Sequence, residues 1–369
     1  MRNDNNGLPA LNLAARSLWR LPYSFEIARL LGPSYSLRCV LFHDISDTET
    51  PFTKGLGGTV SRRKFEAALQ FISKHYTPVS LQDVLDSFDG RNLPSRPILV
   101  TFDDAYESVC EFAAPLCASF KVPAVFFVNA ACLDNQQLAL DNLVCYVSNG
   151  LGLSAINAAI QAVKGCEERE VRSLKEVFAH FLPSISLSAR ESFRESLIRA
   201  NKIDDAALAV DASLYLSSRQ LRELATYNIE VGNHTYSHVN CRTLGVADFA
   251  GEIERNKDLL ETASGTKIRS FSIPYGSSAD LTPALLSHLQ QSGHDAVFLA
   301  EGRSNGIFAD RLRINRTSVR PNSDSTLFSE IEVLPRLRGI RDALLEGSRK
   351  RNRADRGQAI TSVPIREGD

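Results

Sequence analysis

Short apolar runs alternate with amphipathic helical patterns along most of the chain, and this alternation limits the fold more than any other feature. The first half has apolar runs at 37–44, 96–104 and 123–129, with a clear helical pattern at 61–76. The alternation returns after about residue 226, with apolar runs at 227–233, 268–273, 295–300 and 311–319. Continuous apolar runs separated by helices are typical of a parallel sheet buried on both faces. Enough runs are present to close a barrel.

The middle of the chain interrupts this pattern. Residues from about 131 to 221 lack repeated strand signals and contain helical stretches such as AINAAIQAVKG and EREVRSLKEVFAHFL. We therefore expect a barrel over 37–320 with a helical insertion at about 131–221. We expect an N-terminal helical extension over 1–36, and a C-terminal helix and disordered basic tail over 321–369. An insertion after a barrel strand lies where substrate specificity is usually built.

Composition excludes several functional classes. Of the 369 residues, 43% are hydrophobic and 23% are charged, and the formal net charge is -1, so we expect a soluble globular protein with no nucleic-acid partner. The seven cysteines are odd in number and scattered, with no CxxC pair. This spacing predicts neither a disulfide framework nor a thiolate zinc site.

The N-terminal sequence indicates a cytoplasmic location. Charged and polar residues occur throughout the first 25 positions, and no segment of the chain approaches the roughly 18 apolar residues of a membrane span. Residues 14–31 are somewhat amphipathic, with Arg16, Arg20 and Arg29 among apolar residues. We favour a helix packed on the barrel here, and peripheral membrane contact is the alternative.

Two pairs of polar residues follow apolar runs. Asp103 and Asp104 come at the end of the strand-like run that begins at residue 96. An ordinary turn would explain two Asp residues at this point. Alternatively, one carboxylate binds a metal ion and the other transfers protons. His234 and His238 follow another strand-like run, and their spacing places both imidazoles on one side of a helical turn. In a parallel sheet the two pairs share one rim. Two imidazoles and a carboxylate would bind a divalent ion and leave positions open.

Two further strand ends are candidates. Residues 271–273 are predicted as a strand that ends in the turn Pro274-Tyr275-Gly276, for which an ordinary Pro-Gly loop is the simpler interpretation. His43 ends the first apolar run. A lone histidine at a strand end is more often structural than catalytic.

As a set, the motifs TFDD, NHTYSH and PYG resemble the metal-dependent polysaccharide deacetylases, the NodB-homology or carbohydrate esterase family 4 group. The resemblance spans about Leu37 to Val319, apart from the helical insertion. The motif FHDISD is similar to the strand end of the branch with an N-terminal Tyr/Phe-His. The resemblance implies a distorted (β/α) barrel of the NodB-homology type, a divalent metal that is usually Zn²⁺, and removal of N-acetyl groups from amino sugars of glycans.

The resemblance also implies roles for individual residues. Asp104, His234 and His238 match the metal ligands, and Asp103 matches the catalytic base. The backbone N–H of Tyr275 matches the donor to the tetrahedral oxyanion. These residue types suit a metal that polarises the amide and activates water, with a carboxylate that accepts the water proton.

The sequence departs from the family pattern in three places. Ser272 occupies a position where many members have an Arg that orients the base, so we expect Arg316 to take this role, with Arg313 behind it; ordinary surface ion pairs are the alternative. No late LxLxH strand supplies an acid; in the branch with an N-terminal Tyr/Phe-His, a histidine near the start of the domain fills this role, so the resemblance implies His43 as the acid. Ala105 follows the Asp pair where Gly is usual; a turn tolerates Ala there only if its φ is negative, and on that condition we expect the site to remain intact.

The leading hypothesis is a metal-dependent hydrolase that removes an N-acetyl group from an amino sugar of a glycan or glycan precursor. A glycan O-acetyl esterase would use the same residues. A non-catalytic glycan-binding barrel is the alternative suggested by Ser272 and the missing late histidine. Two imidazoles and one carboxylate also fit an Fe(II) oxygenase, although TFDD and PYG have no role there.

Overall fold

The computed structural model describes residues 9–30, 37–306 and 310–341. The strands are β1 (Arg38–Phe42), β2 (Thr77–Pro78), β3 (Pro97–Asp103), β4 (Ala124–Val128), β5 (Ile229–Asn233), β6 (Ser270–Ser272), β7 (Ala296–Leu299), β8 (Ile314–Asn315) and β9 (Thr317–Ser318). The α-helices are α1 (Pro9–Ser17), α2 (Ser24–Arg29), α3 (Arg62–His75), α4 (Leu81–Phe88), α5 (Ala114–Ser119), α6 (Leu140–Leu151), α7 (Leu153–Gln161), α8 (Leu174–Glu176), α9 (Leu187–Asn201), α10 (Asp205–Ala212), α11 (Ser218–Glu223), α12 (Arg255–Ser264), α13 (Pro283–Gln291) and α14 (Asp324–Phe328).

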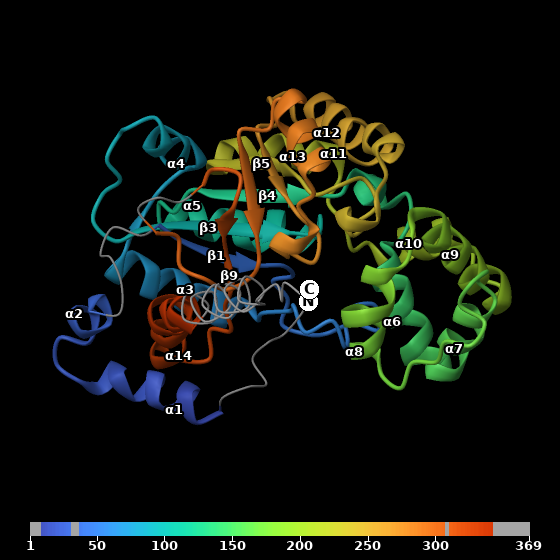
Figure 1. Cartoon of the computed structure of the whole chain (residues 1–369), viewed down its shortest axis with the longest axis horizontal. Helices are drawn as coiled ribbons and strands as arrows, with labels where there is room; N and C mark the ends of the chain where they lie inside the picture. Colours follow the sequence, from blue (N-terminus) through green and yellow to red (C-terminus); the bar gives the residue numbers. More distant parts are fainter. Residues whose placement is uncertain (1–8, 31–36, 307–309, 342–369) are drawn as a thin grey trace, which may run out of the picture.

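The strands form a nearly closed parallel barrel. The sheet order is β8-β7-β6-β5-β4-β3-β1-β9, and β2 pairs with β3 outside this path. Every paired strand is parallel to its neighbour. The segment 314–318 closes the barrel, because β8 pairs with β7 and the adjoining β9 pairs with β1. The (β/α) barrel expected from the alternation of apolar runs and helices is therefore confirmed (Figure 1).

Five of the strands, β1, β3, β4, β6 and β7, are buried along their lengths, as a sheet covered on both faces requires. All residues of β1, β3 and β4 are buried. Phe42, Phe65 and Phe102 form a ring cluster that joins β1, α3 and β3. Gly232 in β5 permits close packing, since a Cβ there would lie 2.3 Å from the ring of Phe127. These contacts fix the strand register that places the polar strand ends on one rim.

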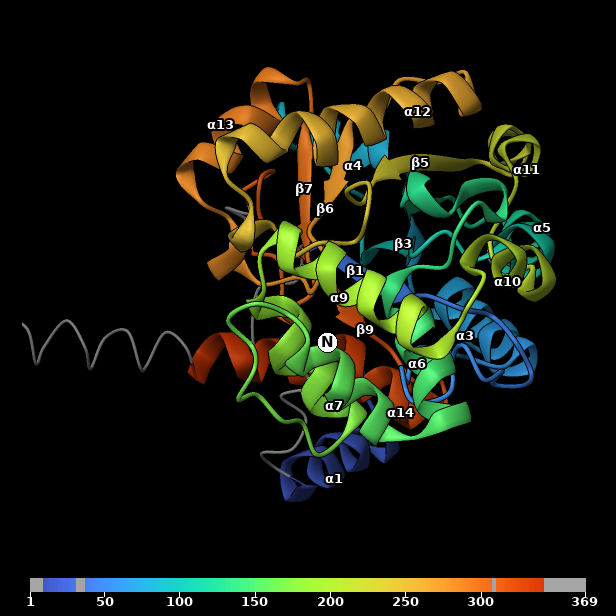
Figure 2. The same cartoon turned by 90° about the vertical axis from the view of Figure 1, so that its right-hand side faces the viewer.

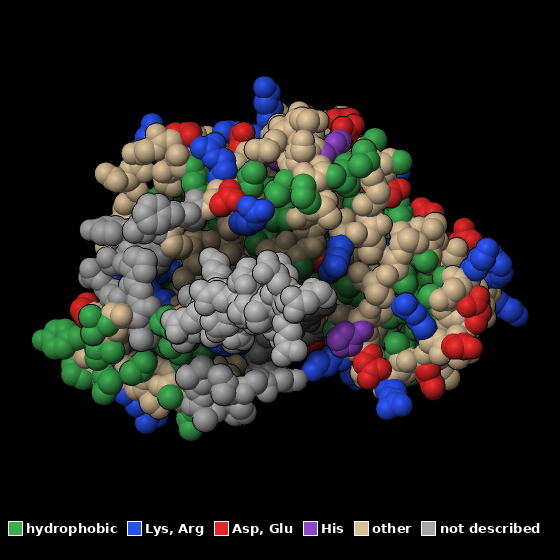
Figure 3. Space-filling view, in the orientation of Figure 1, with side chains coloured by type: hydrophobic (Ala, Val, Ile, Leu, Met, Phe, Trp, Pro, Cys, Tyr) green, Lys and Arg blue, Asp and Glu red, His purple; other side chains and the backbone are tan. Residues whose placement is uncertain are grey.

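Helices α6 to α10 lie between β4 and β5 in the sequence and form a group beside the barrel, whereas α11 packs on α12 at the barrel (Figures 1 and 2). Asn142 of α6 joins this group to the barrel: its amide donates to Tyr106 Oη over 2.9 Å and accepts from Tyr215 Oη over 2.6 Å. On the face shown in Figure 3, acidic and basic side chains are interspersed over this group. Its division from the barrel as an insertion over 131–221 stays a prediction.

The N-terminal and C-terminal helices pack together on the barrel. Trp19 and Phe25 contact Phe328 of α14, and Trp19 also contacts Phe71 of α3. Below them, Arg38 of β1 pairs with Glu332 over 2.7 Å in a buried site. Together these contacts attach both terminal helices to the barrel.

The surface of the N-terminal helices includes exposed apolar side chains, those of Leu13, Leu21, Tyr23 and Leu30. Peripheral membrane contact by this region stays a prediction. Within the described ranges, no helix has the length and hydrophobicity needed to cross a bilayer. The basic tail from residue 342 onward lies outside the described residues.

Candidate active site

The candidate residues meet in one pocket at the carboxyl ends of the strands. His43 follows β1, Asp103 ends β3 and His234 follows β5. All three line a pocket of about 460 Å³, together with Asp104 and His238. The parallel arrangement brings these strand ends together although they are distant in the sequence.

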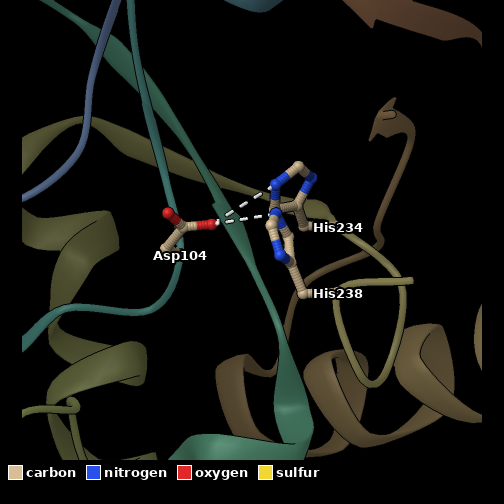
Figure 4. Close-up of side chains that lie close together, drawn as sticks. All are labelled: Asp104, His234 and His238. Atoms are coloured by element: carbon tan, nitrogen blue, oxygen red, sulfur yellow. Dashed lines mark ion pairs between the residues drawn. The ribbon is translucent and has the colours of Figure 1, made fainter. Parts of the chain in front are cut away.

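Asp104, His234 and His238 form a compact group that fits a metal ion. The Oδ1 atom of Asp104 lies 3.5 Å from Nε2 of His234 and 3.5 Å from Nε2 of His238 (Figure 4). Ligand atoms around a tetrahedral Zn²⁺ are separated by about 3.3 Å, given metal–ligand distances of about 2.0–2.1 Å. The same Oδ1 atom is buried without a hydrogen-bond partner. A buried carboxylate oxygen without a donor is costly, and a cation would satisfy it.

Hydrogen bonds on the far side of each imidazole fix its orientation. Nδ1 of His234 donates to the backbone oxygen of Ser272 over 2.8 Å, and Nδ1 of His238 donates to Asp141 Oδ2 over 3.0 Å. Both Nε2 atoms therefore point to Asp104 with their lone pairs available. Metal-binding histidines characteristically have such an acceptor on the other ring nitrogen.

The loop that holds the two histidines differs from our expectation of a helical turn. Thr235 has a φ of 61° and His238 a φ of 56°, both outside the helical region. Polar side chains bind the loop backbone instead: the amide of Asn129 donates to the oxygen of Thr235 over 3.0 Å and also to that of His234. Asn233 accepts from the Thr235 N–H over 3.0 Å. These bonds compete with helix formation, and the irregular loop still directs both rings inward.

Asp103 has different partners from its neighbour. Arg316 forms two parallel hydrogen bonds with it, from Nη1 to Oδ1 over 2.7 Å and from Nη2 to Oδ2 over 2.8 Å. Arg316 is fully buried. Burial has the largest single effect and raises the pKa of the Asp103 carboxyl, but Arg316, His234 and His43 together outweigh it, so the pKa lies below its ordinary value. Arg313 instead pairs with Asp310 at the surface.

Ser272 makes space for this arginine. Nη2 of Arg316 donates to Ser272 Oγ over 2.6 Å, so the guanidinium lies beside the position where many family members have their own arginine. Arg316 lies in the segment that closes the barrel, between β8 and β9. The cation that the sequence lacks on β6 is thus supplied by the residue between β8 and β9.

The backbone of the turn after β3 is left-handed. Asp104 has a φ of 79° and Ala105 a φ of 58°, so our expectation of a negative φ at Ala105 is wrong. The turn is held by backbone bonds from the Asp104 N–H to Phe127 over 3.2 Å and from the Leu216 N–H to Ala105 over 3.1 Å. These bonds and complete burial of Ala105 stabilise a conformation that is unfavourable for a residue with a Cβ.

His43 lies on the other side of Asp104. Its Nε2 atom is 4.0 Å from Asp104 Oδ2, and its side chain is buried. Burial lowers the pKa of His43, although Asp104 and Asp103 act in the opposite direction. His43 lines the pocket next to the candidate metal site.

Tyr275 lies in a tight turn above His238. The Gly276 N–H donates to the oxygen of Ile273 over 3.0 Å, and Tyr275 has a φ of 65°. A Cβ at Gly276 would lie 2.4 Å from that of Ala300, which restricts this position to glycine. The Tyr275 ring is centred 5.2 Å from the His238 ring. The turn thus packs directly on a candidate metal ligand.

Sequence reasoning missed three residues that support the site. Asn129, Asp141 and Arg190 are each buried and contact the histidine loop or its ligands. Asn129 follows β4, and a polar residue at a strand end was a usable signal for it. Asp141 and Arg190 lie in helices without any motif, so no local pattern indicated them.

Comparison with known proteins relates part of the sequence to one family and the fold to several solved structures. No curated protein matches the chain. The sequence profile of the family described as "Polysaccharide deacetylase" matches residues 195–298, which include both site histidines and the PYG turn. The remaining comparisons are with solved structures.

Three solved structures share the fold. The deacetylase PplD of Streptococcus pyogenes in complex with acetate has a TM-score of 0.54 at 14% identity, covering 81% of this chain and 99% of that one. IcaB from Ammonifex degensii has a TM-score of 0.51 at 19% identity, covering 82% and 98%. A de-N-acetylase from Aggregatibacter actinomycetemcomitans has a TM-score of 0.51 at 16% identity, covering 78% and 96%.

These likenesses concern the fold, and the narrower branch suggested by FHDISD stays a prediction. The profile match, the shared fold and the grouping of TFDD, NHTYSH and PYG on one rim agree with one another. The resemblance to the polysaccharide deacetylases that the motifs predicted is confirmed: residues 195–298 match the profile of that family, and solved deacetylases share the fold.

Proposed function

We propose that this protein removes the N-acetyl group from an amino sugar of a glycan or glycan precursor, with a divalent metal held by Asp104, His234 and His238. One observation carries the proposal. The buried Oδ1 atom of Asp104 has no hydrogen-bond partner and lies 3.5 Å from both imidazole Nε2 atoms, which is the arrangement a cation would complete. The donor set of two imidazoles and one carboxylate favours Zn²⁺.

A bound Zn²⁺ would polarise the acetyl carbonyl and lower the pKa of water. The protein groups supply the proton transfers. Asp103 stays ionised because Arg316 lowers the pKa of its carboxyl, so it can accept a proton from the attacking water. Its Oδ2 atom is 3.7 Å from His234 Nε2, which places it beside the candidate metal ligands.

Two other groups would act on the acetyl group and the amine. The backbone N–H of Tyr275 would donate to the oxyanion that forms on the former carbonyl oxygen. His43 would donate a proton to the departing amine, because a neutral amine leaves more readily than an amide anion. The assignment rests on the position of His43 in the pocket, across Asp104 from the two site histidines.

The substrate class follows from the family and the pocket. A pocket of about 460 Å³ is large enough to hold a sugar residue. One structural neighbour is described as a de-N-acetylase, and another contains acetate, the acid released by such a reaction. We also propose a cytoplasmic location, in which a polysaccharide precursor would be the substrate.

The test replaces Asp103 by Asn. The Asp103→Asn variant should retain bound zinc and lose amine release from N-acetylated oligosaccharides, with Asp310→Asn as a surface control. Zinc content is measured by elemental analysis and free amine by a colorimetric assay. An O-acetylated glycan assayed in parallel distinguishes an esterase. Unchanged amine release from Asp103→Asn would remove Asp103 as the base, and no release by the wild type from any glycan tested would favour a binding protein.

A further inference from the structure

Two charged residues of the helical group extend into the candidate metal site. Asp141 lies in the first turn of α6 and Arg190 in α9, and both are buried. Oδ2 of Asp141 accepts from His238 Nδ1 over 3.0 Å and lies 3.8 Å from Nη2 of Arg190. Neither belongs to the barrel strands that supply the ligands.

We propose that Asp141 is a positioning residue for the metal centre: it holds His238 in the tautomer and orientation that present Nε2 to the ion, and Arg190 holds Asp141 in place. The proposal rests on the proposed metal site. A carboxylate hydrogen-bonded to Nδ1 keeps the proton there and makes Nε2 a better ligand. His234 obtains the same orientation from a neutral acceptor, the Ser272 backbone oxygen.

Backbone conformation makes this support necessary for His238. The residue has a φ of 56° and lies in an irregular loop, so no regular element fixes its side chain. Its ring is also less buried than that of His234, with side-chain exposures of 17% and 2%. An external anchor therefore matters more for His238 than for the enclosed His234.

Arg190 connects three parts of the site. In addition to approaching Asp141, it donates to the Ser237 backbone oxygen over 3.4 Å and to Tyr275 Oη over 3.2 Å. The histidine loop, the PYG turn and α6 thus share one buried guanidinium. Loss of the Asp141 charge would remove a carboxylate that pairs with this buried cation, and removing one partner of a buried ion pair is costly.

The helical group is consequently part of the metal centre and not only a wall of the substrate pocket. The barrel supplies three ligands, and α6 and α9 orient one of them. A ligand that binds only the folded form stabilises that form, so metal binding should also stabilise the packing of α6 and α9 on the barrel.

The experiment measures metal affinity without using activity. Purified full-length wild type, Asp141→Asn and Asp141→Ala are titrated with Co²⁺, monitored by its d–d absorption, and Zn²⁺ affinity is measured by competition with a chromophoric chelator. His238→Ala is the reference for loss of a ligand. Asp205→Asn is the matched control, because Asp205 pairs with Arg194 within the same helical group and is not in contact with the site histidines.

We expect Asp141→Ala to weaken binding of both metals about 10–100-fold, with a smaller loss for Asp141→Asn, whose amide oxygen still accepts from His238. The Co²⁺ spectrum of Asp141→Ala should also change, and Asp205→Asn should match the wild type. If Asp141→Ala does not fold, the Asn variant decides the outcome by the same measurements.

Two results would overturn the proposal in distinguishable ways. Wild-type affinity and an unchanged spectrum in the folded Asp141 variants, with weak binding by His238→Ala, would show that His238 is a ligand that needs no help from Asp141. Equal metal binding by the wild type and His238→Ala would instead refute the proposed metal site itself.

Discussion

The barrel rim and the helical group contribute to the same site in different ways. On the rim, Asp103 ends β3 and Asp104 follows it, while His234 and His238 lie in the loop after β5. The direction of the two strands therefore brings these residues to the same end of the barrel. In the helical group, Asp141 and Arg190 reach the site only because α6 and α9 pack against the rim. A parallel barrel gathers its strand ends whatever their spacing in the sequence, whereas a helix side chain needs a specific docking geometry.

The two regions also use charge differently. On the rim, the Arg316–Asp103 pair is buried: the side-chain exposure is 0% for Arg316 and 5% for Asp103. The helical group has exposed pairs as well, such as Arg199 with Glu195, whose exposures are 81% and 69%. Replacing one partner of a buried ion pair lowers the stability of the fold strongly, whereas replacing one partner of an exposed pair changes it little. The four predictions below test this contrast.

Metal removal should have the largest effect. Dialysis against a chelator should reduce amine release by the wild type by about 10³-fold or more, since Lewis-acid catalysis supplies several kcal/mol. Zinc should restore the wild type but not Asp104→Asn, which lacks an anionic ligand on the rim. Recovery of Asp104→Asn to wild-type activity by zinc would contradict the assignment of Asp104.

Replacing Arg316 by Met should destabilise the barrel. The change leaves Asp103 buried and unpaired, so we expect the free energy of unfolding to fall by about 3–5 kcal/mol. Arg199→Met in the helical group should change it by about 0–1 kcal/mol. Urea denaturation followed by circular dichroism provides both values. Similar losses in the two variants would remove the distinction between buried and exposed pairs.

The pH profile tests His43 as the acid. An acid must be protonated to donate, and burial lowers the pKa of His43 below the usual value of 6.5. In the wild type, kcat/KM should therefore decline with rising pH from a point below about 6.5, and His43→Gln should lose this decline and about 10²-fold or more in rate. The measurement is kcat/KM for an N-acetylated oligosaccharide between pH 5 and pH 9. A profile unchanged in His43→Gln would assign the acid role to another group.

The smallest effect on stability is expected from placing glycine at residues whose backbone has a positive φ. Ala105 on the rim has a φ of 58°, and Lys202 after α9 has a φ of 52°. Glycine removes the steric cost at such positions but raises the entropy of the unfolded chain, so Ala105→Gly and Lys202→Gly should each stabilise by up to about 1 kcal/mol. Thermal unfolding measures both. A decrease in stability at Ala105 would mean that its Cβ packing outweighs the backbone cost.

The sequence predicted the barrel and the set of rim residues because both depend on local patterns. Apolar runs of strand length alternate with helical patterns, and polar motifs directly follow the strands. Arg316 was also predicted, from the need for a cation near Asp103, and it lies within hydrogen-bond distance of that carboxylate. The roles of these residues in catalysis stay predictions.

Backbone detail was less accessible to sequence reasoning. The histidine spacing suggested a helical turn, but the side chains of Asn129 and Asn233 bind the loop backbone and produce positive φ values. The sign of φ at Ala105 was likewise wrong, because tertiary hydrogen bonds from distant segments hold that turn. Such bonds involve partners many residues away, which local propensity does not include.

By itself, the sequence determined which groups stand at the ends of the strands, because the period and length of the apolar runs fix where each strand stops. The tertiary structure alone decided how those groups differ: Arg316 pairs with Asp103 and leaves Asp104 Oδ1 without a donor between two imidazoles. It also brought Asp141 to His238 from a separate group of helices. Contacts of this kind depend on how helices dock against the rim, and docking is a property of the whole fold.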